Sequence, residues 1–107
     1  MTDENKKIQE MQLLEQNLQN ILLQKQAFQM ELSETQSALK EIENSGDETF
    51  KIIGQLMIKT EKSKIKKELL DKEKILNLRI KAIEKQEFSF TEQLEKFREE
   101  FMKSTEK

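Results

Sequence analysis

The sequence contains no cysteine, histidine, proline, tryptophan or tyrosine, and it has only two glycines in 107 residues. Without cysteine no disulfide can form, which is consistent with a reducing compartment. A zinc site would have to be built from carboxylates alone, and a serine nucleophile would lack its usual histidine base. Neither Gly46 nor Gly54 belongs to a phosphate-binding motif. We therefore expect no catalytic centre, no metal, no cofactor, and a protein that is not an enzyme.

Signals for a membrane or for nucleic acid are also scarce. Residues 1–7 lack the apolar core of a secretory signal, and no stretch approaches the roughly 20 apolar residues of a membrane span. A net charge of −2 argues against a general binder of nucleic acid. We interpret the one basic group as a solvated face rather than a site for nucleic acid or an acidic protein. The group consists of Lys59, Lys62, Lys64, Lys66 and Lys67. We expect a cytoplasmic protein.

The composition favours long helices with a thin core. Hydrophobic residues make up 35% of the chain and charged residues 37%, so a thick globular core cannot be filled. The supply suffices for one apolar stripe along each helix, as in a coiled coil. The scarcity of helix-breaking residues indicates helices of unusual length.

Two heptad patterns define these helices. With Met11 at position a, the first has eight apolar residues at ten a and d sites and predicts a helix over about residues 4–43. Its sites are Met11, Leu14, Leu18, Ile21, Lys25, Phe28, Leu32, Thr35, Leu39 and Ile42. With Leu69 at position d, the second also scores eight of ten and predicts a helix over about 61–103, capped by Thr60 or Ser63. Its sites are Leu69, Glu73, Leu76, Ile80, Ile83, Glu87, Phe90, Leu94, Phe97 and Phe101.

The linker between the two patterns is about fifteen residues long, which favours antiparallel pairing of the helices within one domain spanning residues 1–107. In that arrangement Lys25 lies on the seam, where Glu84 or Glu87 offers it a charge partner. We interpret Lys25 as a residue that fixes the register of the helices.

Residues 49–59 form a β-branched insert that predicts a hairpin. Gly54 and Gln55 suit a type II′ turn, because its first position needs a positive φ. The resulting register leaves both faces of the hairpin largely apolar, and a hairpin this small is not stable alone in water. We expect it to pair with other chains, and the alternative is that it folds onto its own helix ends. The assembly residues would be Phe50, Ile52, Ile53, Gly54, Leu56, Met57 and Ile58.

Several apolar residues are not needed by the seam. They are Leu13, Leu23, Met30, Leu70, Ile75, Leu78, Phe88 and Met102. Four of the six phenylalanines lie in the last twenty residues, and methionines lie near the other end of the chain. Helix ends fray, so such ends can expose adaptable apolar surface for other apolar chains. The alternative is that the residues near the ends only complete the seam.

The order helix, hairpin, helix resembles the beta-class subunit of prefoldin. The similarity is greatest over residues 48–60, ETFKIIGQLMIKT, and continues over residues 24–26 and 78–87. The resemblance implies a mainly α fold in which an antiparallel two-helix coiled coil is joined by a β-hairpin. It also implies that the hairpin enters an inter-subunit β-barrel, in a hexamer of two alpha-class and four beta-class subunits.

The resemblance further implies an ATP-independent chaperone, a holdase, that binds unfolded polypeptides at the coiled-coil tips and delivers them to a group II chaperonin. The residues at the tips that would contact the client are Ile8, Met11, Leu14, Leu94, Phe97, Phe101 and Met102. The alternative is a structural coiled-coil adaptor that binds no client. An adaptor would share the helices but would not require strands that are apolar on both faces.

Overall fold

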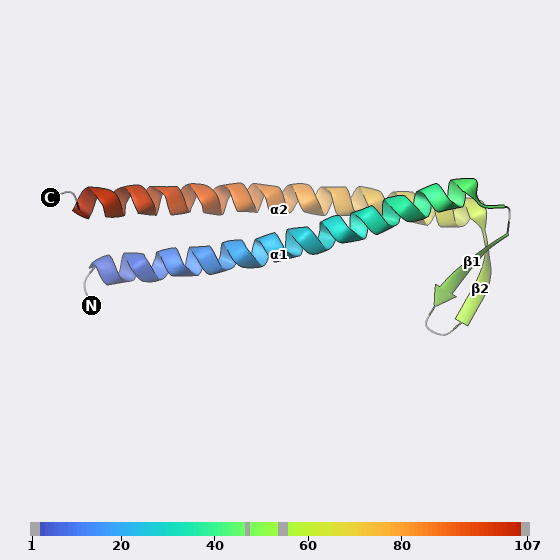
Figure 1. Cartoon of the computed structure of the whole chain (residues 1–107), viewed down its shortest axis with the longest axis horizontal. Coiled ribbons are helices and arrows are strands. Elements are labelled where there is room, and N and C mark those ends of the chain that lie inside the picture. Colours follow the sequence, from blue (N-terminus) through green and yellow to red (C-terminus); the bar gives the residue numbers. More distant parts are fainter. Residues whose placement is uncertain (1–2, 47, 54–55, 106–107) are drawn as a thin grey trace. The chain divides into compact units, whose positions relative to one another are not determined.

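The computed structural model describes residues 3–46, 48–53 and 56–105. The elements follow in the order α1 (Asp3–Asn44), β1 (Glu48–Ile53), β2 (Leu56–Glu61) and α2 (Lys62–Thr105) (Figure 1). The predicted fold, two long helices joined by a hairpin, is confirmed. Neither helix contains a segment apolar enough to cross a lipid bilayer over the residues described.

The strands pair in the register that the sequence predicts. β1 and β2 are antiparallel, with Ile53 opposite Leu56 and Glu48 opposite Glu61 at the two ends of the ladder. The predicted type II′ turn stays a prediction, because Gly54 and Gln55 lie outside the described residues.

The junctions between helix and hairpin are held by hydrogen bonds. After α1 ends, Ser45 donates to the carbonyl of Ile42 from its backbone N at 3.2 Å and from its Oγ at 2.8 Å. Lys62 Nζ donates to the carbonyl of Ser45 at 2.9 Å, which ties the start of α2 to the end of α1. The predicted cap of α2 is wrong: strand pairing continues to Glu61, so Thr60 lies in β2 and Ser63 lies inside α2.

The chain forms two compact units, each with a section of both helices. The first unit contains residues up to Ala27 and from Lys81 onward, and the second contains residues 28–80 with the hairpin. In the first unit, Lys7 Nζ lies 3.5 Å from Glu100 Oε2 and Lys25 Nζ lies 3.0 Å from Glu87 Oε2. Residue numbers increase along α1 while those of its contacts on α2 decrease. The two helix sections are therefore antiparallel.

The second unit repeats this antiparallel pairing. Glu31 pairs with Lys72 at 4.0 Å, and Glu43 pairs with Lys66 at 3.7 Å. The guanidinium of Arg79 also lies over the ring of Phe28, 5.7 Å from the ring centre, which is a favourable cation–π geometry.

The seam follows the heptads closely. Of the twenty predicted seam positions, all but Phe101 are buried or half-buried. Among the residues with described burial, Thr35 is the buried polar one. Its Oγ1 donates to the carbonyl of Glu31 at 2.8 Å, so its hydroxyl stays hydrogen-bonded. The eight apolar residues predicted to lie off the seam are all exposed. The apolar stripe therefore accounts for the core of each unit, and these eight apolar side chains lie outside it.

Candidate functional site

The ends of α1 and α2 in the first unit enclose a small apolar cavity. Its volume is about 70 Å³. Ile8 and Met11 of α1 and Phe97 and Phe101 of α2 supply its apolar lining. These four belong to the predicted set of client-contacting residues, and heptad packing brings them together because each lies on or beside the seam. The remaining lining residues are Glu4, Lys7 and Glu100.

The three other residues of that predicted set lie elsewhere. Leu94 is only 4% exposed and Leu14 is half-buried, and both are seam residues that do not line the cavity. Met102 is 64% exposed, on the outer side of α2. Phe101 is the one exposed seam residue, at 41%. The end of α2 thus combines a seam aromatic open to solvent with an exposed methionine beside it.

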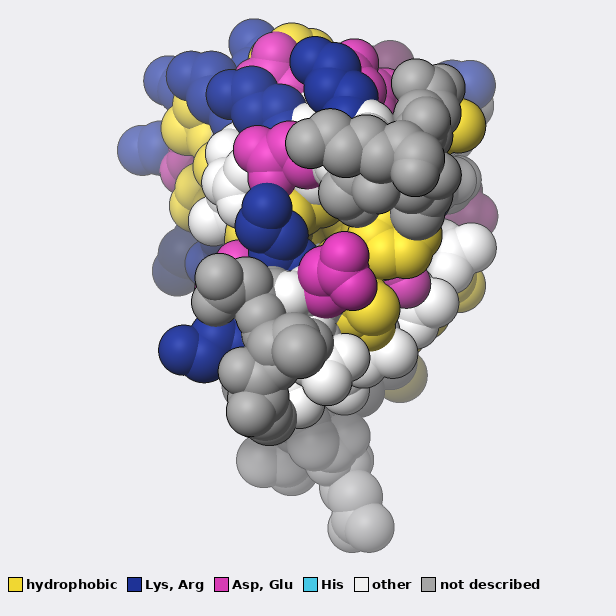
Figure 2. All heavy atoms as spheres, turned by 90° about the vertical axis from the view of Figure 1, so that its left-hand side faces the viewer, with side chains coloured by type: hydrophobic (Ala, Val, Ile, Leu, Met, Phe, Trp, Pro, Cys, Tyr) yellow, Lys and Arg dark blue, Asp and Glu magenta, His cyan; other side chains and the backbone are white. Residues whose placement is uncertain are grey.

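Charged side chains border the cavity. The Lys7–Glu100 pair is well exposed, with each side chain more than half accessible. Figure 2 is viewed from the side where α1 begins and α2 ends. Hydrophobic side chains are visible there among charged ones. An exposed pair of this kind contributes little to stability and opens at little cost. The apolar lining is therefore bordered by groups that do not hold the cavity closed.

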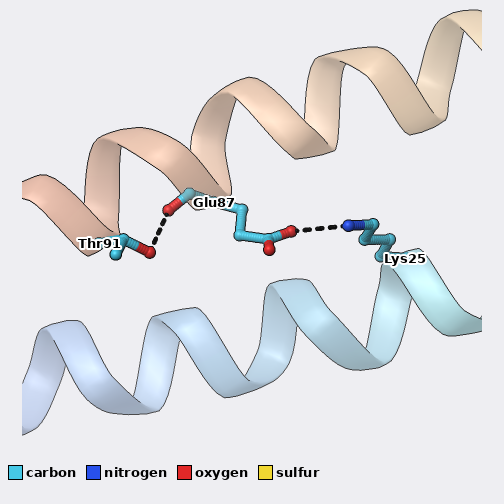
Figure 3. A network of polar contacts seen from close by, with 3 residues as sticks. All are labelled: Lys25, Glu87 and Thr91. Carbon is cyan, nitrogen blue, oxygen red and sulfur yellow. Dashed lines mark hydrogen bonds and ion pairs between the residues drawn. The ribbon is translucent and has the colours of Figure 1, made fainter.

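A polar layer interrupts the seam of the first unit. Lys25 Nζ donates to Glu87 Oε2 at 3.0 Å, and both side chains are mostly buried, with 23% and 30% accessible (Figure 3). Thr91 Oγ1 donates to the carbonyl of Glu87 at 2.8 Å. Glu87 is one of the two partners predicted for Lys25.

Substituting Lys25 with alanine is expected to lower the free energy of unfolding by about 1–2 kcal/mol, because Glu87 would keep a partly buried charge without its partner. Lys7→Ala is the matched control, since it breaks an exposed pair and should cost less than about 0.5 kcal/mol. Urea unfolding followed by circular dichroism measures both. Equal losses of unfolding free energy in the two variants would contradict the assignment of Lys25 and Glu87 to a partly buried ion pair.

The predicted assembly residues lie in the hairpin. Phe50, Ile52 and Ile53 belong to β1, and Leu56, Met57 and Ile58 belong to β2, whereas Gly54 lies outside the described residues. Met57 is 66% exposed. Among the described contacts, Lys51 of β1 reaches α2, with its Nζ 3.1 Å from Glu68 Oε2. This contact is an exposed ion pair, so it does not bury an apolar face of the hairpin.

Part of the basic group is occupied within the fold. Lys66 pairs with Glu43, and Lys62 donates to the carbonyl of Ser45. These contacts place two of the five lysines at the hairpin–helix junction, and the interpretation of the group as a solvated face stays a prediction.

Comparisons with known proteins agree with one another. The family model described as "Prefoldin subunit" matches residues 5–107. The prefoldin subunit beta of Thermococcus onnurineus is 42% identical over 82 residues, which cover 75% of this chain and 71% of that protein. That of Archaeoglobus fulgidus is 32% identical over 102 residues, which cover 94% and 82%. The crystal structure of the prefoldin beta subunit from Thermococcus strain KS-1 superposes with a TM-score of 0.87 at 33% identity, covering 94% of this chain and 90% of that one.

Proposed function

This chain belongs to the prefoldin family, among the beta-class subunits, and on that premise we propose that it is a holdase subunit that binds unfolded polypeptides at its helix ends. A chaperone-type function follows from the family. The binding site, the assembly and the route of the client are our proposals.

The observation that carries the binding proposal is the apolar surface at the helix ends. Four apolar side chains line one cavity, and one of them, Phe101, is partly exposed, as is its neighbour Met102. Methionine and phenylalanine adapt to apolar partners of different shape, which suits clients that share no sequence. Each contact is shallow and weak, so tight holding requires several tips acting on one client.

Such multivalency requires an assembly, and the hairpin is the element proposed to build it. Pairing of β1 and β2 with the hairpins of neighbouring subunits would satisfy the outer edges of both strands. We propose a hexamer of two alpha-class and four beta-class subunits, as the family resemblance implies. The tips of the hexamer would hold the client without ATP and release it to a group II chaperonin. The lack of a phosphate-binding glycine motif in the sequence is consistent with this.

Replacing both Phe97 and Phe101 with serine is expected to weaken client holding strongly. Each substitution removes a ring from the tip surface, and the combined loss should reduce affinity for an unfolded client by about tenfold or more. The measurement is suppression of aggregation of a chemically unfolded client by the assembled protein, over a series of subunit concentrations.

Phe88→Ser supplies the matched control, because Phe88 is 65% exposed but does not line the cavity. It should hold clients like the unmodified protein. Helicity and mass of each variant are checked first by circular dichroism and light scattering. Full suppression of aggregation by the doubly substituted assembly would reject the tip as the binding site and favour the structural adaptor.

A further inference from the structure

Part of one side of the helix pair in the first unit carries no charge. We call it the neutral flank and define it as the residues one before or three after a d position of the heptads, within residues 13–27 of α1 and 82–93 of α2. Further along α2 the same positions carry Lys96 and Glu100. On α1 these residues are Leu13, Asn17, Asn20, Gln24 and Ala27. On α2 they are Ala82, Gln86, Ser89 and Gln93. Positions beside a coiled-coil seam often carry Glu and Lys, and 37% of this chain is charged, so an uncharged run of this length is a distinct feature.

The neutral flank contains a groove. Its volume is about 370 Å³, which lies within the roughly 300–1,000 Å³ common for ligand sites. Ile21, only 8% exposed, and Phe90, half-buried, contribute its apolar lining from the seam. The other lining residues are Asn17, Asn20, Gln24, Gln86 and Ser89. The groove therefore offers four carboxamides and a hydroxyl around a narrow apolar strip.

Two charges next to the groove in sequence neutralise each other. Lys25 and Glu87, each adjacent in sequence to a groove residue, pair with each other at 3.0 Å. Ser89 is oriented by Gln93, whose Nε2 donates to Ser89 Oγ at 3.5 Å. The groove is thus lined by groups that donate and accept hydrogen bonds but attract neither anions nor cations strongly.

We propose that this groove binds the backbone of an extended polypeptide segment, as a second contact for the clients of the proposed function, on which this inference rests. Each carboxamide provides donors and an acceptor, which match the N–H and C=O groups of an unfolded chain. A nucleic acid would need cations that the groove lacks. A partner helix would present no unpaired backbone groups along its side. Recognition of the backbone does not depend on client sequence, so it complements the apolar tip.

The test uses two uncharged peptides of serine, alanine and leucine with the same sequence and a fluorescent label. One peptide has alternate backbone nitrogens methylated, which removes donors but leaves the side chains unchanged. We expect the full chain to bind the unmethylated peptide about tenfold more tightly, the factor expected from losing one or two net hydrogen bonds. Fluorescence anisotropy measures the affinity, and added salt should change it little.

Asn17→Ala, Gln24→Ala and Gln86→Ala combined should abolish the difference between the two peptides, because alanine keeps the helices and removes the carboxamides. The matched control combines Gln16→Ala, Gln19→Ala and Gln26→Ala, which are exposed glutamines outside the groove and should leave the difference intact. The variant with Phe97→Ser and Phe101→Ser should also keep the preference for the unmethylated peptide. This variant therefore separates failure of the groove from failure of the tip.

Three results would overturn the proposal. The first is equal affinity of the unmodified protein for both peptides, or no binding of either. The second is an undiminished preference for the unmethylated peptide after the three groove substitutions. The third is displacement of the peptide by single-stranded DNA of mixed sequence in a manner that depends strongly on salt, since that would identify a polyanion site.

Discussion

Substituting both Ile52 and Ile58 with aspartate is expected to abolish the hexamer and leave separate chains. The ladder places Ile52 opposite Met57 and Ile58 opposite Lys51. Neighbouring positions in a strand alternate between the two faces of a sheet, so these adjacent pairs belong to opposite faces. The double substitution therefore places a carboxylate on each face of the hairpin. If the strands are covered by neighbouring subunits, each burial of an unpaired carboxylate costs several kcal/mol.

Light scattering of the chain mixed with an alpha-class subunit measures this directly. The matched control is Ile75→Asp with Leu78→Asp, since both side chains lie on α2 outside the hairpin and are 48% and 59% exposed. It introduces the same charge and should keep the mass of the six-chain complex. A hexamer that survives the hairpin substitutions would refute the role of the hairpin in assembly.

Replacing Leu76 with alanine is expected to lower the free energy of unfolding by about 2–5 kcal/mol. Leu76 is 2% exposed, which makes it the most buried large side chain among the described residues. A thin seam has no second layer that could move in to fill the space left by the lost methyl groups. The cost should therefore include a cavity as well as the lost burial of the side chain.

Leu78→Ala is an unusually close control, because the same substitution two residues away removes a side chain that is 59% exposed. It should change the free energy of unfolding by less than about 0.5 kcal/mol. Thermal and urea unfolding, followed by circular dichroism at equal protein concentration, compare the two variants. Equal losses at both positions would contradict the difference in burial between Leu76 and Leu78.

The heptads predict the fold well because a repeat of seven restricts which side of each helix can be buried. Leu76 and Leu78 illustrate this: identical residues receive opposite environments from their heptad positions alone. Lys25 and Glu87 follow from the same logic, since antiparallel pairing on a fixed linker leaves few partners within reach. The strand register also follows from the sequence, because a two-residue connection forces Ile53 opposite Leu56.

The sequence is less informative where several local structures compete. The start of α2 depends on how far strand pairing extends, and pairing to Glu61 overrides the capping preference of Thr60 and Ser63. The groove escapes prediction for a different reason. Asn17, Gln24 and Gln86 resemble ordinary solvated residues one at a time, and only their placement on the same side of two paired helices gives them a common role. The signal that would find them is an uncharged run at the flanking heptad positions.

Within the described chain, β1 and β2 have only each other as strand neighbours, so each strand keeps one outer edge. In a cell, a newly made copy that has not met its companions would display both edges to every other nascent chain. If the hairpin builds the proposed assembly, synthesis in excess of the partner subunits would leave copies with both strand edges unpaired. Matched production of the subunits would then be a requirement that two six-residue strands impose on expression.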